Sequence, residues 1–142
     1  MNAIFERLSP WSELAGRLLL ALIFIVTGLG KISGFEGTQG YMEAMGVPGA
    51  LLPLVIVTEV GGGLLIALGL FTRYSALALA GFSLLSALLF HNNIADQTQQ
   101  IMFLKNLAIA GGFLYLVANG AGRMSLDRRL GRSKQESQHG FD

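Results

Sequence analysis

Four long stretches of the chain are almost entirely hydrophobic, and polar residues gather between and after them. Each stretch is long enough to cross about 30 Å of hydrocarbon, which takes roughly 20 helical residues. The stretches are apolar nearly all round, which in a chain this short is typical of helices in lipid. They predict four transmembrane helices, at about residues 14–31, 50–71, 74–92 and 100–118.

Proline and glycine mark the ends of these helices. The Ser9-Pro10 pair is typical of a helix start. Pro53 falls in the first turn of the second helix, where the missing N–H costs little. Gly69 precedes a very short connection to the third helix, which makes the second and third helices antiparallel neighbours. Gly120 follows the fourth helix, before a basic tail.

Three polar segments flank or interrupt the spans. Residues 1–12 are expected to form an N-terminal segment at the membrane interface. Residues 35–48, between the first two spans, predict a short surface helix that ends at Gly46. Residues 130–142 are polar and predict a disordered tail. The spans and their connections, residues 13–129, form one domain.

Composition supports a membrane protein and excludes several kinds of chemistry. The 142 residues are 52% hydrophobic and only 13% charged, whereas a soluble domain carries about 25% charge. With no Cys and only two His, the chain offers neither disulfides nor a recognisable metal site. We therefore predict an all-α integral membrane four-helix bundle. Its main partner is the lipid bilayer, and no nucleic acid is expected.

The distribution of positive charge predicts the orientation of the bundle. Lys and Arg are kept in the cytoplasm during membrane insertion. In a four-span chain the two termini and the loop at Arg73 share one side, which holds eight of the ten basic residues: Arg7, Arg17, Arg73, Arg123, Arg128, Arg129, Arg132 and Lys134. We expect a bacterial inner-membrane protein with both termini in the cytoplasm, and we interpret Arg17 and Arg73 as topology signals.

A few polar side chains within the outer half of the spans are candidate ligand-binding residues. An ionised carboxylate in hydrocarbon costs several kcal/mol unless it is paired, so Glu59 should face the interior and meet Lys31 or Lys105. Glu59 either forms a structural ion pair, serves a ligand, or is protonated there. Lys31 is alternatively an interface anchor, and His91 a helix-end residue. Asn106, next to Lys105, completes the candidates.

Glycines inside the second and fourth helices predict close packing. Glycine loses entropy in a helix interior, and the usual reason for it in a membrane is close approach of two backbones. A second interpretation is room for a flat ligand beside Glu59. The glycines concerned are Gly61, Gly62, Gly63, Gly111 and Gly112.

Several motifs together resemble the DoxX family of small bacterial inner-membrane proteins, and within it the YqjF-like branch. The segments that carry the resemblance are "FIVTGLGKISGF" (24–35), "YMEAMGVPG" (41–49), "EVGGGLLIALGLFTR" (59–73), "LLFHNN" (88–93), "FLKNLAIAGGFL" (103–114) and "GAGRMSLD" (120–127), together with Arg17. The resemblance implies a four-helix membrane fold. Some members resemble subunits of thiosulfate:quinone oxidoreductase, and many have no defined activity.

The favoured functional hypothesis is a membrane subunit of a quinone-linked redox system. In it, Lys31 or Lys105 donates a hydrogen bond to a quinone carbonyl and Glu59 handles the proton. No redox centre is encoded in the chain, so electrons come from a redox partner protein or a bound cofactor, and catalysis by the chain alone is not established. The alternatives are a binding or permeation module for small aromatic or lipid-like molecules, and a scaffold subunit, with a homo-oligomer also allowed.

Overall fold

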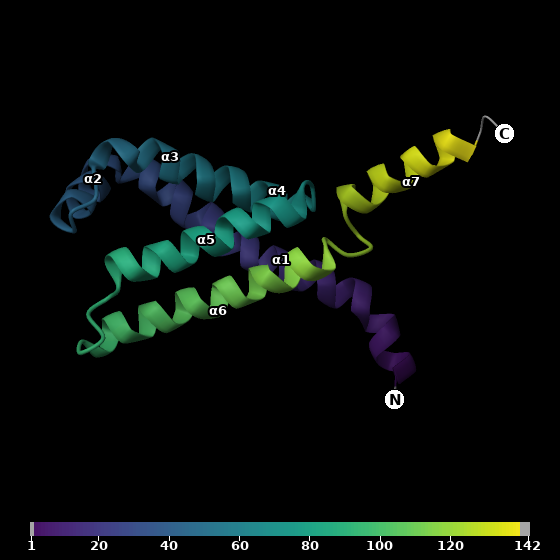
Figure 1. Ribbon diagram of the computed structural model, residues 1–142, viewed down its shortest axis with the longest axis horizontal. Helices are drawn as coiled ribbons and strands as arrows, with labels where there is room; N and C mark the ends of the chain where they lie inside the picture. The colour runs from purple at the N-terminus through teal and green to yellow at the C-terminus, as the bar shows by residue number, and fades with distance from the viewer. Residues whose placement is uncertain (1, 140–142) are drawn as a thin grey trace.

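The computed structural model describes residues 2–139, leaving aside the side chains of residues 133–134 and 136–139. The described chain is all helical, which confirms the predicted fold class (Figure 1). Four stretches are long and apolar enough to cross a membrane. They are Asn2–Ser33, Gly49–Leu68, Thr72–Phe90 and Gln97–Asn119.

The first helix is longer than the sequence pattern predicts. Helix α1 (Asn2–Ser33) has 32 residues, about 48 Å at 1.5 Å per residue, which exceeds the thickness of the hydrocarbon core. Pro10 lies inside α1 rather than at its start. The expected helix start at Ser9 is therefore wrong: its hydroxyl donates to the Phe5 carbonyl, 2.9 Å away, within the same helix. The N-terminal segment continues the first span instead of forming a separate element.

The second span is built from four short helical pieces that follow one another. They are η1 (Gly49–Leu51), α3 (Leu52–Ile56), η2 (Val57–Gly61) and α4 (Gly62–Leu68). Pro53 lies at the start of α3, as predicted. Gly69 ends α4 in the left-handed conformation, with φ of 68°. Helix α5 (Thr72–Phe90) begins directly afterwards and packs antiparallel to α4.

The helices pair unequally inside the bundle. Helix α1 packs along η2 and α4, and α5 packs along its length against α6 (Gln97–Asn119), as Figure 1 shows. The Phe24 and Phe113 rings meet edge to face, with centroids 5.4 Å apart, and this contact joins the two pairs of helices. The core is small and made mainly of alanine and phenylalanine: Ala21, Phe24, Ile66, Ala76, Leu79, Ala80, Ala110 and Phe113.

Two further helices lie outside the spans, at opposite ends of the bundle. Helix α2 (Phe35–Ala44) is the short helix predicted between the first two spans, and Gly46 follows it with φ of 80°. Helix α7 (Leu126–His139) covers most of the segment expected to be a disordered tail. That expectation was based on polarity alone and is wrong for residues 130–139. Residues 140–142 lie outside the described part of the chain.

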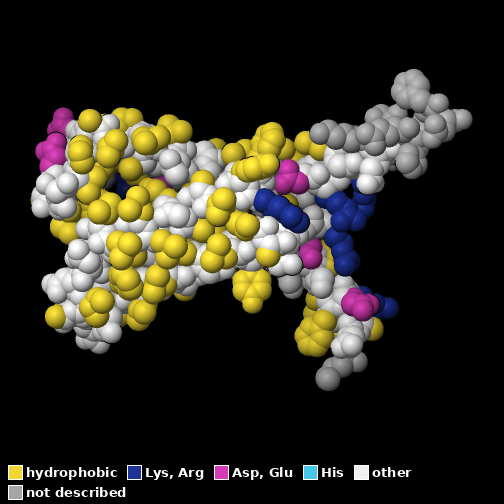
Figure 2. Space-filling view, in the orientation of Figure 1, with side chains coloured by type: hydrophobic (Ala, Val, Ile, Leu, Met, Phe, Trp, Pro, Cys, Tyr) yellow, Lys and Arg dark blue, Asp and Glu magenta, His cyan; other side chains and the backbone are white. Residues whose placement is uncertain are grey.

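The surface separates hydrophobic from basic side chains. Large hydrophobic residues are exposed all along the spans, where lipid would cover them. Lys and Arg side chains gather at the end of the bundle from which α7 projects (Figure 2). We call this end the α7 end, and the opposite one the α2 end. By the charge prediction, the α7 end is cytoplasmic.

Candidate functional site

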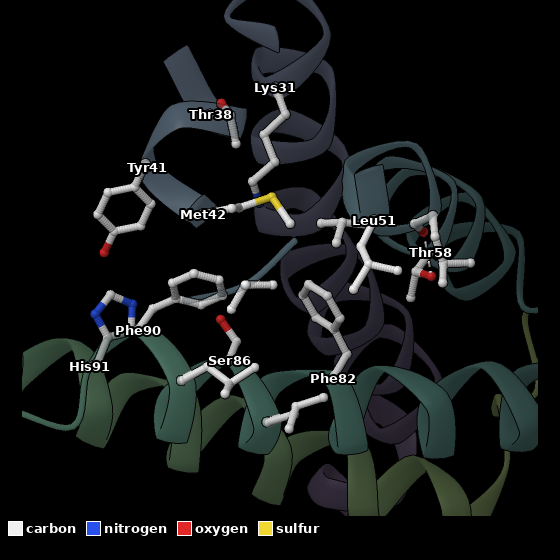
Figure 3. A pocket seen from close by; sticks show the side chains of 15 residues that line it. Lys31, Thr38, Tyr41, Met42, Leu51, Thr58, Phe82, Ser86, Phe90 and His91 are labelled. Atoms are coloured by element: carbon white, nitrogen blue, oxygen red, sulfur yellow. Dashed lines mark hydrogen bonds between the residues drawn. The ribbon is translucent and has the colours of Figure 1, made fainter. Parts of the chain in front are cut away.

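A cavity of about 340 Å³ lies at the α2 end of the bundle. Helices α1, α2, α3 and α5 all contribute to its wall, and Figure 3 shows their side chains converging on it. A volume of this size falls within the range of small-molecule sites, which are mostly apolar with a few polar groups. The wall follows the same rule. Its polar members are Lys31, Thr38, Tyr41, Thr58, Ser86 and His91.

The charged group of the cavity is an ion pair. The Lys31 ammonium lines the cavity and donates to Oε1 of Glu59 in a close salt bridge. The Thr27 hydroxyl lies 3.3 Å from the other carboxylate oxygen. Glu59 is buried, with 3% of its surface exposed, so the pair supplies the partner that a carboxylate in an apolar interior requires. Of the two expected partners of Glu59, the structure selects Lys31.

A π-helical turn and a glycine contact place Glu59 opposite α1. Residues Val57–Gly61 form the π-helical segment η2, a rare geometry that is frequent at functional sites. A Cβ at Gly28 would lie 3.1 Å from the Glu59 Cβ and 2.6 Å from Val60 Cγ2. The backbone of α1 therefore approaches η2 at Gly28 more closely than any larger residue would permit. Lys31, nearly one turn further along α1, reaches back to the carboxylate.

Aromatic rings line two sides of the cavity. Tyr41 of α2 stacks on Phe90 of α5, with centroids 5.6 Å apart and planes inclined by 24°. Phe82 lies deeper, where its ring also meets Phe24 edge-on at 6.3 Å. The Tyr41–Phe90 stack links α2 to the end of α5 across the cavity (Figure 3). None of these rings stood out in the sequence, because aromatic residues on an apolar helix are usually core or lipid-facing.

The cavity is bordered by leucines that also face the bilayer. Leu51 and Leu54, from η1 and α3, line it on one side, and Leu85 and Leu89 of α5 on the other. All four are exposed on the surface of the chain. The cavity therefore opens laterally between the second span and α5, within segments that are long and apolar enough to cross a membrane.

His91 lies at the end of the cavity furthest along α5. Its Nδ1 is 2.8 Å from Oε1 of Gln99, on α6. An Nδ1–H that donates to this oxygen leaves Nε2 as a hydrogen-bond acceptor. The cavity then has a donor, Lys31, and an acceptor, His91, on its wall.

The other predicted site residues lie elsewhere. Lys105 is exposed on α6, and neither Lys105 nor Asn106 lines the cavity. The glycines inside the helices fall into two groups. A Cβ at Gly62 would meet Leu79, one at Gly63 would meet Ile25, and one at Gly112 would meet Leu20, all at 2.9–3.1 Å. Open space faces Gly61 and Gly111.

Arg17 has a structural role that the sequence analysis missed. Only 3% of its surface is exposed. Its guanidinium donates to the carbonyls of Ala121 at 2.6 Å, Met124 at 2.9 Å and Ala67 at 3.3 Å. Arg17 therefore joins α1 and α4 to the segment after α6. The sequence shows a charge near the start of an apolar run, which does not distinguish a buried clamp from a topology signal.

Asp127 forms a second connection at the α7 end. Its carboxylate accepts from the Phe71 and Thr72 backbone N–H groups, at 2.8 and 2.9 Å. Its own N–H donates to the Gly69 carbonyl at 2.9 Å. Asp127 thus caps the start of α5, where a carboxylate is favoured by both hydrogen bonding and the helix dipole. The same residue fixes the start of α7 against the turn between α4 and α5.

Among the side chains that the structure describes, no group of three or more His, Cys, Asp or Glu could hold a metal ion. The chemistry available at the cavity is therefore that of one ammonium–carboxylate pair, an imidazole and several hydroxyl groups. This set can hold an uncharged polar group by hydrogen bonds and can exchange protons with it.

Comparisons with a family model and with individual proteins both indicate one family of membrane proteins. The sequence model of the DoxX family matches residues 12–92. The chain is 53% identical to inner membrane protein YqjF of Escherichia coli K12, over 89% of this chain and 98% of that protein. It is 41% identical to inner membrane protein YphA of the same organism, over 88% and 94% of the two chains.

A third relative is more distant. A Bacillus subtilis protein named "Putative oxidoreductase CatD" is 36% identical over 51% of this chain and 52% of its own length. No solved structure matches the chain at a significant level.

Proposed function

The chain belongs to the DoxX family of inner-membrane proteins, and we propose that it is the quinone-binding membrane subunit of a redox system. The observation that carries the proposal is the cavity at the α2 end. It combines an apolar, aromatic wall with Lys31, whose ammonium pairs with the buried carboxylate of Glu59 beside the cavity. A quinone has the matching chemistry: a flat, largely apolar ring whose carbonyl oxygens are its strongest hydrogen-bond acceptors.

The polar groups of the cavity suit a carbonyl at the ring edge. Lys31 has three N–H donors, of which one serves Glu59 and the others remain for a ligand. A hydrogen bond from an ammonium to a carbonyl is stronger than one between neutral groups. Phe82 and the Tyr41–Phe90 stack offer ring faces and edges to the rest of the molecule.

The position of the opening favours a ligand that dissolves in the bilayer. Leu51, Leu54, Leu85 and Leu89 border the cavity and face lipid. A quinone with an isoprenoid tail would enter between the second span and α5 with its tail still in the membrane. It would not need to cross water.

Proton transfer at the bound carbonyl falls to the ion pair. Reduction of a quinone to a quinol consumes two electrons and two protons. The proposal assigns the electrons to a redox partner protein, in keeping with the oxidoreductase named among the relatives. Lys31 would pass one proton to the ring oxygen that it contacts, and the second proton would come from the aqueous phase. The Glu59 carboxylate would hold the ammonium in place and lower the cost of its charge.

Binding of a short-chain ubiquinone to the purified protein tests this function. We expect Lys31→Met and Glu59→Gln to weaken binding about 10- to 100-fold, the range for loss of a hydrogen bond to a charged group. Lys105→Met is the matched control, because this lysine is exposed and outside the cavity. The affinity of Lys105→Met for ubiquinone should equal that of the unaltered protein. Equal binding by all four proteins, or none by the unaltered one, contradicts the proposal.

The lateral opening also favours a second function, the binding or permeation of small aromatic or lipid-like molecules without electron transfer. A dimethoxybenzene of similar shape distinguishes the two, because it cannot be reduced and its ether oxygens are poorer acceptors. Equal affinity for this compound and the quinone would favour the second function. Mass spectrometry of the protein purified in mild detergent adds a further criterion: a co-purifying quinone favours the first function, and protein partners without a small molecule favour a scaffold.

A further inference from the structure

A second concave surface lies at the opposite end of the bundle. It is a groove of about 530 Å³ between the end of α4 and the first turns of α7. Four arginines line it: Arg123, Arg128, Arg129 and Arg132. Its remaining wall is largely apolar and includes Leu68 and Met124. The proposed quinone function makes no use of this groove.

The arginines of the groove form no salt bridge with any side chain that the structure describes. None of the residues lining the groove is Asp or Glu. Two carboxylates at this end of the bundle accept hydrogen bonds from backbone N–H groups. Asp127 accepts from Phe71 and Thr72, and Glu13 accepts from Arg123 at 3.2 Å. The groove therefore keeps a local positive charge, and it lies at the end of the bundle where Figure 2 shows basic side chains gathering.

The groove is a built feature rather than a chance arrangement of flexible arginines. Arg17 donates to the Ala67 and Met124 carbonyls, and these residues belong to opposite walls. The hydrogen bond from the Asp127 N–H to Gly69 fixes the start of α7 beside the end of α4. The hydrogen bonds of the buried Arg17 and the backbone hydrogen bond from Asp127 to Gly69 thus hold the two walls of the groove at a fixed spacing.

The groove also lies at the level where the spans end. Leu68 is the last residue of the second span, and α6 ends at Asn119, shortly before Arg123. On the spanning side of the groove, Leu64 and Leu68 are both exposed on α4, one turn apart. A phosphate among the arginines would have apolar surface directly below it, on the bilayer side.

We propose that this groove binds the phosphate headgroup of an anionic phospholipid, whose acyl chain follows α4 past Leu68 and Leu64. Arginine side chains bind phosphate through paired N–H donors, and basic segments next to a transmembrane helix attract anionic lipids. The lipid would fix α7 against the membrane surface. The hydrogen bonds of Arg17 and Asp127 would then position the lipid site as well as stabilise the fold.

Binding of phosphatidylglycerol in micelles of a neutral detergent tests the proposal, with phosphatidylcholine as the zwitterionic comparison. Lipid retained by the protein is counted by native mass spectrometry, and the unfolding midpoint is followed as lipid is added. We expect the double variant Arg129→Gln/Arg132→Gln to lose about 30-fold in affinity for phosphatidylglycerol. Arg7→Gln/Arg73→Gln removes the same charge from exposed residues outside the groove and should bind as the unaltered protein does.

Three results would overturn the proposal: equal affinity for the two lipids, equal losses in the two double variants, or inorganic phosphate that binds as tightly as the lipid. If the groove variant does not fold, Arg129→Lys/Arg132→Lys and the salt dependence of the unaltered protein decide. Lysine keeps the charge without the paired donors, so a partial loss is expected. Added salt should weaken phosphatidylglycerol binding and leave phosphatidylcholine binding unchanged.

Discussion

Gly28 lies directly against Glu59, so that a Cβ on the glycine would be 3.1 Å from the Cβ of the glutamate. This contact connects the packing of the bundle to its candidate site. Because Gly28 has no side chain, α1 approaches the π-helical turn closely enough for Lys31 to reach the Glu59 carboxylate. The geometry of the ion pair therefore depends on a residue with no chemistry of its own.

Replacement of Gly28 should disturb both stability and the site. In Gly28→Ala the new methyl group would lie 2.6 Å from Val60 Cγ2 and 3.3 Å from the Val60 N. Overpacking of this kind costs about 1–3 kcal/mol. Gly30→Ala is the matched control on the same helix, since nothing lies within 4 Å of its Cβ position. Thermal unfolding should show a lower midpoint for Gly28→Ala alone, and equal midpoints would show that α1 and η2 are not in tight contact.

Asp127 should matter more for stability than its exposed surroundings indicate. Asp127→Ala removes the two acceptors of the Phe71 and Thr72 N–H groups, and loss of a helix cap costs about 0.5–2 kcal/mol. Asp96→Ala is the control, because it removes the side chain that caps α6 by accepting from the Thr98 N–H and leaves the contacts of α7 intact. We expect trypsin to cleave after Arg128 and Arg129 faster in Asp127→Ala than in Asp96→Ala. Identical cleavage rates would mean that Asp127 does not hold α7.

The orientation of the bundle can be tested by single cysteines, because the chain has none of its own. Gly40 in α2 and Gly131 in α7 both face open space, so each should accept cysteine without strain. A membrane-impermeant maleimide should label Gly40→Cys in intact cells and Gly131→Cys only after lysis. This result follows from the charge distribution, which favours a cytoplasmic α7 end. Labelling of both cysteines in intact cells would contradict a four-span topology.

The sequence predicted those features that depend on the length and hydrophobicity of a segment. The four spans follow from uninterrupted apolar runs and from glycine and proline at their ends, and the short α2 follows from the segment between the first two spans that ends at Gly46. The need of Glu59 for a partner also follows, since a buried carboxylate is costly wherever it lies. The choice of Lys31 over Lys105 does not, because it depends on which helices are neighbours. Helix α6 packs mainly on α5, which leaves Lys105 on an exposed face.

Features that depend on contacts between distant segments could not be predicted. The π-helical turn around Glu59 has the same residue types as an α-helix, and only the resulting packing shows it. The acceptors of Arg17 are backbone carbonyls, which leave no trace in residue identity. The polar composition of residues 130–139 was a poor guide to α7, since Asp127 fixes the first turn of that helix by contacts to residues more than fifty positions earlier.

The Lys31–Glu59 pair gives the sharpest test of the candidate site. Removal of one partner leaves the other charge in an apolar interior without compensation. Lys31→Met alone should therefore lower the free energy of unfolding by about 3–5 kcal/mol, the usual cost of breaking a buried pair. Glu59→Gln should cost less, because the amide keeps the shape of the carboxylate and can still accept a hydrogen bond from the ammonium or from the Thr27 hydroxyl.

The double variant Lys31→Met/Glu59→Gln should lose less free energy of unfolding than the two single variants lose together, since it leaves no unpaired charge. Lys105→Met/Glu59→Gln is the matched control, and its two effects should simply add, because the structure does not bring these residues together. Thermal or denaturant unfolding in detergent is measured for the unaltered protein, the three single variants (Lys31→Met, Lys105→Met and Glu59→Gln) and the two double variants. Additive losses in the Lys31 cycle would rule out the ion pair. Stability near that of the unaltered protein for Glu59→Gln, together with lost quinone binding, would assign the carboxylate to the ligand rather than to the fold.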